Sequence, residues 1–278
     1  MIDSKNFNRP LFRWYKKNKR EFEWRKTKDP WKILLIETLS QQTQIERADK
    51  YYKKFIIKYP DPKSMAVSKS ASILRDWSGL GYNNRAIRLQ EAAKKIYKDG
   101  WSNYVEDLSL LPGVGDYTKS AIESFALGKK VIAVDTNILR VLRRFYGKKV
   151  NHSWIKENTS SLLLQKRSRD WNEAIMDLAS LVCTKELPKC DICPLEDSCM
   201  KYFFNEKKKH IESFKNSSRE KRGKILKELL ESRELKFHEI SKLIKLNQKE
   251  MMYLLNKMRE DKLIEINENK RIVILTKR

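Results

Sequence analysis

A single acidic residue interrupts a strongly apolar segment near the N-terminus. Glu37 is the only ionisable side chain in residues 33–39, whose sequence is ILLIETL. If this segment is buried, loss of contact with water raises the pKa of the carboxyl group, which then becomes a credible proton donor. The alternative is an exposed glutamate on an amphipathic helix, and the segment alone does not decide between the two.

A second carboxyl group follows another apolar stretch. Asp135 comes directly after residues 131–134 (VIAV) and precedes a helical pattern. Aspartate is a favoured N-cap residue, and taken alone this interpretation is preferred. A carboxylate at a helix start near a bound DNA strand could equally stabilise positive charge that develops on a sugar.

Two short segments have residue types that suit contact with nucleic acid. Gly113, Val114 and Gly115 join two expected helices, so the free N–H groups and the dipole of the second helix can bind one phosphate without reading a base. An ordinary helix–helix turn is the alternative. Gln41 and Gln42 carry uncharged amides, which suit base edges or a vacated position in the base stack.

All four cysteines lie within 17 residues of each other, and they are Cys183, Cys190, Cys193 and Cys199. Four thiolates can bind one zinc ion or one iron–sulfur cluster, and the single Cys-x2-Cys pair leans only modestly toward a cluster. Four protein ligands leave no open coordination position, so either group is expected to be structural. Three neighbouring lysines would present a basic loop to phosphates: Lys185, Lys189 and Lys201.

The composition indicates what kind of protein positions these groups. The 278 residues include 60 Lys plus Arg against 36 Asp plus Glu, for a formal net charge of +24, and 40% of them are hydrophobic. A folded protein with this charge attracts a polyanion or an anionic membrane face. Only 8 Gly and 7 Pro occur, which favours a mainly α fold.

The sequence shows no membrane or export signal. No apolar run approaches the roughly 18 residues of a membrane span, and the first residues lack the apolar core of a signal peptide. The clustered cysteines are unlike a secreted disulfide framework, in which cysteines are spread along a small chain. We therefore expect a cytoplasmic protein that does not enter a membrane.

Two domains and a linker are expected. Residues 1–205 show helical patterns with short connections, and a basic linker follows at residues 206–220. Examples of the helical patterns are 31–59, 71–80 and 85–98.

Residues 221–278 are expected to form a small second domain. Three segments with apolar residues at helical spacing precede an alternating segment at residues 263–275 that is typical of a β-hairpin. This order predicts a winged helix-turn-helix whose third helix contacts DNA. A small packing or protein-interaction module is the alternative. The polar residues of the third helix are Gln248, Lys249 and Lys257.

Taken together, these motifs resemble the helix-hairpin-helix DNA glycosylase superfamily and, within it, the MutY-type adenine DNA glycosylases. The resemblance covers about residues 11–202 and implies a helical glycosylase fold with a [4Fe–4S] cluster on the four cysteines. The segments that carry it are Phe22-Glu23-Trp24-Arg25, Asp29-Pro30-Trp31, Glu37 with residues 41–44, Gly79-Leu80-Gly81-Tyr82, Leu111-Pro112-Gly113-Val114-Gly115, Val134-Asp135, and residues 172–177.

The resemblance implies a monofunctional glycosylase that flips a base and cleaves its N-glycosidic bond. Glu37 would protonate adenine at N7, and Asp135 would stabilise the oxocarbenium-like sugar. Asn137 would orient the Glu37 side, and Tyr117 would lie against the same sugar. The related endonuclease III enzymes have a Schiff-base lysine at the position of Tyr117, so this chain is expected to cleave the strand only weakly.

Further contacts follow from the same resemblance. Gln41 and Tyr82 would wedge into the duplex beside the vacated position, while Trp24 and Arg25 would line the base pocket. Glu173 is a departure, because the adenine-specific family has a base-reading glutamine there. An ionised glutamate can accept a hydrogen bond from the adenine amino group but cannot donate one.

The resemblance also implies the partners and leaves alternatives open. The expected partner is duplex DNA with a mispaired or damaged base, most directly adenine opposite 8-oxoguanine or guanine, bound by a monomer. The family's C-terminal Nudix-like domain has no counterpart, and the expected winged helix takes its place. One alternative is a glycosylase that removes thymine or uracil opposite guanine. Another is a redox-sensing DNA-binding regulator, which would leave Glu37, Tyr117 and Asp135 unexplained.

Overall fold

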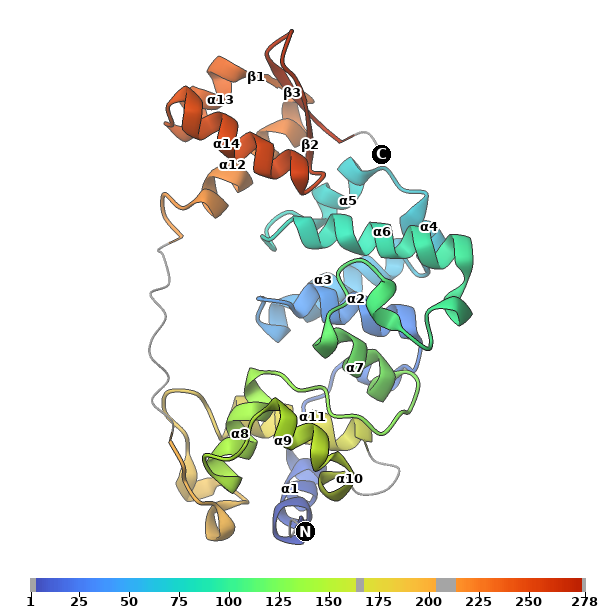
Figure 1. Cartoon of the computed structure of the whole chain (residues 1–278), viewed down its shortest axis with the longest axis vertical. Coiled ribbons are helices and arrows are strands. Elements are labelled where there is room, and N and C mark those ends of the chain that lie inside the picture. The colour runs from blue at the N-terminus through green and yellow to red at the C-terminus, as the bar shows by residue number, and fades with distance from the viewer. Residues whose placement is uncertain (1–3, 164–167, 204–213, 277–278) are drawn as a thin grey trace. The chain divides into compact units, whose positions relative to one another are not determined.

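The computed structural model describes residues 4–163, 168–203 and 214–276 (Figure 1). The chain forms two compact units, each built from two separate stretches. Met1–Glu37 and Val114–Lys207 form the first unit, and Thr38–Gly113 and Lys208–Arg278 form the second. The described residues are mainly helical, as the composition predicts. None of the helices in these ranges combines the length and apolar character that a membrane crossing requires.

The first unit is helical and carries the cysteines on an irregular loop. Helix α2 (Pro30–Ser40) begins in this unit and ends in the second. The other helices are α1 (Lys5–Asn18), α7 (Asp116–Phe125), α8 (Thr136–Tyr146), α9 (His152–Glu157), α10 (Thr159–Leu162) and α11 (Ser168–Leu181), with 3-10 turns at Glu23–Lys26, Cys190–Ile192 and Glu196–Ser198.

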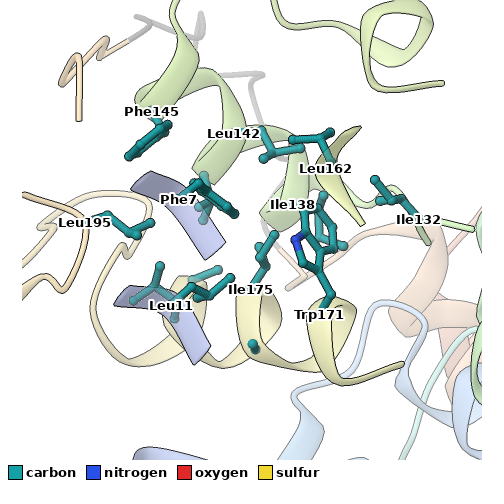
Figure 2. Close-up of a cluster of buried hydrophobic side chains, with 14 of the residues drawn as sticks. Phe7, Leu11, Ile132, Ile138, Leu142, Phe145, Leu162, Trp171, Ile175 and Leu195 are labelled. Atoms are coloured by element: carbon teal, nitrogen blue, oxygen red, sulfur yellow. The ribbon is translucent and has the colours of Figure 1, made fainter. Parts of the chain in front are cut away.

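The core of this unit is packed from helices α1, α8 and α11 (Figure 2). Phe7 and Leu11 lie four residues apart on α1, so both point to the same side of the helix. They meet Leu142 of α8 and Trp171 of α11, and all four side chains are fully buried. Leu195, from the loop between the cysteines, joins the same cluster and ties that loop to the helices.

One buried polar group in this core is fully paired. Asn8 is completely buried, and its amide nitrogen donates to the Leu162 carbonyl at 2.9 Å while its oxygen accepts from Trp171 Nε1 at 2.8 Å. These bonds offset the cost of removing the amide from water. They also fix α1 against α10 and α11.

The second unit contains a helical part and a small mixed part. The predicted helical stretch 31–59 is divided, because α2 ends at Ser40 and the next helix begins at Ile45. Gln42 has φ 55°, a left-handed conformation that cannot continue a right-handed helix. The elements of the helical part are α3 (Ile45–Lys58), α4 (Pro62–Ala66), α5 (Ser70–Trp77), α6 (Asn84–Asp99) and 3-10 turns at Trp101–Asn103 and Leu108–Leu110.

The C-terminal part has three helices and a three-stranded antiparallel sheet in the order β1-β3-β2. The predicted hairpin is present, and Val273 in its centre pairs with Leu235 on one side and Ile266 on the other. Strand β1 was not predicted, because three residues are too few to show alternation. The elements are α12 (Ser218–Ser232), β1 (Glu234–Lys236), α13 (Phe237–Ile244), α14 (Gln248–Glu260), β2 (Ile264–Asn267) and β3 (Ile272–Leu275).

The expected linker overlaps the first of these helices. Helix α12 begins at Ser218, capped by the Ser217 hydroxyl, which lies inside the predicted linker 206–220. The reason is local, since a serine cap followed by Glu220 starts a helix even in a charge-rich segment. Residues 206–213 lie outside the described residues.

The core packing can be tested with two leucines of the first unit. Leu142 is fully buried, whereas Leu187 is 82% exposed. Leu142→Ala is expected to lower the free energy of unfolding by about 2–5 kcal/mol, and Leu187→Ala by less than about 0.5 kcal/mol. Chemical denaturation of both variants measures the difference. Equal stabilities would contradict the assignment of this core.

Candidate active site

Two carboxyl groups and a phenol come together in the first unit. Glu37 lies in the last turn of α2, Tyr117 in the first turn of α7, and Asp135 immediately before α8. The Tyr117 side chain hydrogen-bonds the Glu37 carboxyl group, and Asp135 is near enough to affect the pKa of both. Three of the predicted catalytic residues, far apart in sequence, therefore form one electrostatic cluster.

Helix α2 places Glu37 in an environment with little water. Every residue from 31 to 39 is buried except Lys32, and Glu37 itself is 6% exposed. This burial raises the pKa of Glu37 from 4.5 to about 7, even though the hydrogen bond from Tyr117 lowers it. The negative charges of Asp135 and Glu173 add to the increase. The exposed-glutamate alternative is therefore wrong, and Glu37 can hold a proton near neutral pH.

Tyr117 acts on this cluster as a hydrogen-bond donor. Burial raises its pKa well above 10, and the nearby charges of Glu37 and Asp135 raise it further. The phenol therefore keeps its proton and donates to the Glu37 carboxylate.

Asp135 has the cap role that its sequence position suggests. Its Oδ1 accepts from the Ile138 backbone N–H at 2.7 Å, which caps α8. Its Oδ2 accepts from Asn137 Nδ2 at 2.6 Å, and the Asn137 oxygen accepts from Arg140 Nη1 at 3.0 Å. The cap and the electrostatic contact with Glu37 are thus compatible. Asn137 thus connects Asp135 to Arg140 and fixes the Asp135 carboxylate, and its expected orienting role toward Glu37 stays a prediction.

The segment that leads into Asp135 is held by one buried amide. Asn172 is completely buried, and its oxygen accepts from the Ala133 N–H at 2.9 Å. Its nitrogen donates to the Val131 carbonyl at 3.0 Å, to the Ser168 carbonyl at 2.9 Å and to Ser124 Oγ at 3.1 Å. The segment directly before Asp135, which pairs with no strand in the described part of the chain, is fixed in this way.

Arg25 takes part in a buried ion-pair network. Its two terminal nitrogens each donate to one oxygen of Asp177, both at 2.8 Å, and Arg20 donates to the same carboxylate. Burial alone would favour the neutral acid, but these hydrogen bonds hold the pKa of Asp177 below its usual value. The Arg25 guanidinium is therefore occupied by a structural partner, and it also lies 5.4 Å from the Trp24 ring centroid.

Glu173 belongs to the same network. Its Oε2 accepts from the Tyr15 hydroxyl at 2.7 Å, and its Oε1 accepts from Arg169 Nε at 2.9 Å. The Arg25 Nε lies 3.7 Å from Oε2, beyond hydrogen-bond distance. The buried Glu173 thus accepts two hydrogen bonds in this network, and it adds to the raised pKa of Glu37.

Trp24 presents a buried donor without a partner. The side chain is 6% exposed and stacks on Phe22 with ring centroids 5.1 Å apart. Its Nε1 has no hydrogen-bond partner within the described ranges of the chain. Burying a donor without an acceptor costs free energy. The Trp24 N–H is therefore a candidate to donate to a bound ligand.

The Gly113-Val114-Gly115 segment leads into α7 from a short 3-10 turn rather than from a full helix. Gly113 has φ +84°, and a Cβ there would lie 3.1 Å from the Arg88 Cβ, so both its conformation and the close approach favour glycine. Gly115 is the N-cap of α7 and makes no side-chain cap bond. Backbone N–H groups at this helix start therefore lack a side-chain cap acceptor, as a phosphate site requires.

In the second unit, Arg85 connects the two loops that were expected to wedge into DNA. Arg85 is 6% exposed, and its Nη1 donates to the carbonyls of Thr38 at 3.0 Å, Leu39 at 3.2 Å and Gln41. Its Nη2 donates to the Gly81 carbonyl at 3.0 Å. Burial lowers the pKa of Arg85 to about 10, so the group stays charged at neutral pH.

Arg85 thereby links the loop that carries Gln41 and Gln42 to the loop that carries Tyr82. Tyr82 is 41% exposed with φ 47°, and the Arg85 guanidinium lies 5.6 Å from its ring centroid. Gln42 is also exposed and has a left-handed backbone, and Gln41 is half-buried. Both loops present polar or aromatic side chains, and both are hydrogen-bonded to the same buried guanidinium.

The four cysteines surround one small cavity of about 30 Å³. Arg144 Nη1 donates to Cys183 Sγ at 3.3 Å, and the Lys201 N–H donates to Cys199 Sγ at 3.4 Å. Burial raises the pKa of the Cys193 thiol to about 11. No group of three or more His, Cys, Asp or Glu in the described ranges is arranged to hold a metal ion. Four thiols around one cavity, with N–H groups that donate to two of the sulfurs, nevertheless fit a [4Fe–4S] cluster, in which each iron binds one cysteine.

Comparison with known proteins identifies the family to which the chain belongs. Residues 36–166 match the family model described as HhH-GPD superfamily base excision DNA repair protein. The chain is 32% identical over 216 residues to a thymine/uracil-DNA glycosylase of Methanothermobacter thermautotrophicus, which covers 73% of this chain and 98% of that protein. The protein belongs to the HhH-GPD superfamily.

Other relatives carry a different name. An adenine DNA glycosylase of Buchnera aphidicola subsp. Baizongia pistaciae (strain Bp) is 33% identical over 221 residues, or 74% of this chain. The chain spans 63% of the length of that relative. The solved structure of a thermostable thymine-DNA glycosylase superposes with a TM-score of 0.67 at 31% identity, covering 72% of this chain and 96% of that one.

Sequence reasoning missed several residues that support the site. Asn172 was noticed as part of a motif but not as a support for Asp135, and Arg85, Arg169 and Tyr15 were not singled out. Arg85 follows two asparagines at a helix start, and nothing in the sequence indicates that it is buried. Its role depends on carbonyl groups that only the folded chain brings together.

The raised pKa of Glu37 predicts a pH dependence of stability. The Glu37 carboxyl group has a pKa of 4.5 in the unfolded chain and about 7 in the folded protein. The stabilisation that is present below pH 4.5 is therefore lost as the pH rises to about 7. The loss is about 3 kcal/mol. Glu37→Gln should remove it, and denaturation between pH 4.5 and 8 measures the effect. The exposed Glu157→Gln variant is the control, and identical pH profiles for wild type and Glu37→Gln would contradict the prediction.

Proposed function

We propose that the protein is a DNA glycosylase that flips a mispaired or damaged base out of duplex DNA and cleaves its N-glycosidic bond. The observation that carries this proposal is Glu37, buried and able to hold a proton, beside Tyr117 and Asp135. Cleavage needs a proton on the departing base and negative charge beside the sugar cation. A pair of carboxyl groups in different environments can supply both.

In this mechanism Glu37 donates its proton to N7 of a flipped purine. The bond from C1′ to N9 then breaks, its electron pair leaves with the base, and the base departs neutral. Asp135 stabilises the oxocarbenium-like sugar, with its oxygens fixed by Ile138 and Asn137. Water adds to C1′ and releases one proton, which restores the acid form of Glu37.

Adenine, opposite 8-oxoguanine or guanine, is the base that we propose. Glu173 is held as a hydrogen-bond acceptor by Tyr15 and Arg169, and adenine offers an amino group as donor. The uncharged Gln41 and Gln42 and the N7 role of Glu37 also favour a purine. The Buchnera relative is named an adenine DNA glycosylase, which supports adenine as the proposed base.

A second candidate is removal of thymine or uracil. The observation in its favour is that the Methanothermobacter relative matches this chain over 98% of its own length, without an additional domain. A pyrimidine has no N7, so Glu37 would then act differently and Glu173 would become the first residue to examine as a base reader.

We further propose that the enzyme is monofunctional. A Schiff base with the abasic sugar requires an amine, and Tyr117 has none. Strand cleavage is therefore expected to be weak and to need added alkali.

The cysteines are proposed to hold a [4Fe–4S] cluster. Cys183, Cys190, Cys193 and Cys199 would be its ligands, and binding would displace their protons. When bound, the cluster would hold the loop folded, and the positive charge near DNA would come from Lys185, Lys189 and Lys201 beside the ligands. No step of base removal depends on it.

We also propose that α12, α13, α14 and the three-stranded sheet form a winged helix-turn-helix, with residues 1–205 as the glycosylase domain. The order of helices and the hairpin support this assignment. Duplex DNA is the proposed partner of a monomeric, cytoplasmic protein, and the net charge of +24 supports that partner.

Base release tests the proposed chemistry. Single-turnover assays on A:8-oxoG, A:G, G:T and G:U duplexes, with and without alkali, should show adenine release with breaks revealed only by alkali. Glu37→Gln and Asp135→Asn should each reduce the rate by at least about 100-fold because each removes one charge function. Glu157→Gln is the matched control. Normal rates in either site variant would exclude the mechanism, and release of thymine or uracil alone would favour the second candidate.

The pH dependence of the same rate gives an independent check. The rate should decline above about pH 7 as Glu37 loses its proton. Tyr117→Phe removes the hydrogen bond that favours the ionised carboxylate, so this decline should move to higher pH. A decline that stays in place would mean that Tyr117 does not act on Glu37.

Metal content tests the cluster. Purified wild type should contain about four iron atoms per chain and show visible absorption, and Cys193→Ser should lose most of both. Lys201→Ala, in the same loop, should keep them. One zinc per chain in protein purified without oxygen would instead establish a zinc site.

A further inference from the structure

A basic hollow lies within the second unit, between the loop that carries Tyr82 and helix α12. Its volume is about 490 Å³, and its walls come from residues 78–84 on one side and mainly from α12 on the other. No aspartate or glutamate is among the residues that line it. The cations that line it are Arg219, Arg222 and Lys227.

Arg219 makes a direct contact with Tyr82. Its Nη1 donates to the Tyr82 hydroxyl at 2.6 Å, and its guanidinium lies 5.6 Å from the ring centroid. The Arg85 guanidinium lies at the same distance from that ring. The C-terminal part of the chain therefore supplies a cation to the residue that was expected to enter the duplex.

The charges in the hollow are only partly neutralised. Arg222 pairs with Asp261, but no carboxylate in the described residues pairs with Arg219 or Lys227. Helix α14 contributes no residue to the lining of the hollow, and its Lys257 is paired with Glu260 at 2.8 Å. The positive charge beside the Tyr82 loop in this hollow thus comes from α12 rather than from the helix that the sequence indicated.

Two further features favour a nucleic acid over a small anion. Phe214 lines the hollow and is 63% exposed, so exposed aromatic rings of Phe214 and Tyr82 lie among cations, a combination that suits bases and phosphates. Gly223, in the interior of α12, also lines it, and a Cβ there would meet nothing within 4 Å. Packing does not require this glycine, which is a poor helix former, but it allows a phosphate backbone to approach closely.

We propose that α12 and the Tyr82 loop form one surface that binds the phosphate backbone of duplex DNA next to the position that Tyr82 enters. Arg219 holds the Tyr82 hydroxyl and presents its other N–H groups to a phosphate, and Lys227 contacts a second one. The inference rests on the proposed glycosylase function. It makes the C-terminal part a component of lesion binding rather than a separate DNA-binding module.

Salt-dependent binding tests the surface. The probe is a duplex with a stable abasic-site analogue opposite guanine, and its affinity is measured over a series of KCl concentrations. The double variant Arg219→Gln/Lys227→Gln should reduce the slope of log K against log salt by about 2 and weaken binding roughly 10- to 100-fold near 0.1 M salt. Lys50→Gln/Lys242→Gln removes two exposed charges elsewhere in the second unit and should bind like wild type. Thermal melting confirms that every variant is folded.

A third variant compares the rival helix. If Lys249→Gln/Lys257→Gln weakens binding and lowers the slope while the α12 variant matches wild type, α14 is the DNA-binding element and the proposal is wrong. It is also wrong if the α12 variant and the control lose affinity equally. Failure of the glycosylase proposal looks different, because wild type would then release no base from any of the four mismatched duplexes.

Discussion

The burial of one carboxyl group inside an apolar helix is the constraint on which the rest of the site depends. Helix α2 is covered on nearly all sides, so Glu37 cannot turn toward water, and its pKa rises to about 7. This burial opposes folding at higher pH, yet it creates a proton donor near neutrality. The phenol of Tyr117 moderates the increase by stabilising the ionised form. A small change in the packing of α2 would therefore change the pKa of Glu37.

The second carboxyl group is positioned by backbone and amide hydrogen bonds rather than by burial. Asp135 caps α8 and accepts from Asn137, while Asn172 fixes the segment that precedes it. A cap residue has a defined orientation because its acceptor is aimed at the first N–H groups of the helix. Helix capping and the proposed stabilisation of a sugar cation thus use the same geometry. Desolvation determines the pKa of Glu37, whereas hydrogen bonds determine the orientation of Asp135.

The loops proposed to enter DNA depend on a buried cation without a carboxylate partner in the described structure. Arg85 donates to carbonyls from both loops, so its removal would release Gln41 and Tyr82 together. Carbonyl acceptors leave the net positive charge in place, which favours a nearby polyanion. Arg219 adds a second guanidinium to the Tyr82 ring from the C-terminal part of the chain. Two guanidinium groups thus lie against the Tyr82 ring, one from each part of the second unit.

Sequence alone determined the helical class, the clustered cysteines, the C-terminal hairpin and the identity of Glu37, Tyr117 and Asp135 as candidates, because each follows from local composition, spacing or motif. It also indicated the superfamily. Tertiary structure decided that Glu37 is buried, that Asp135 is both a cap and a neighbour of Glu37, and that α2 and α3 are separate helices. It also decided the roles of Arg85, Asn172 and Arg219. Their partners are carbonyls and side chains distant in sequence, and no periodic pattern encodes such contacts, since they arise only when the folded chain removes the groups from water and leaves them to satisfy one another.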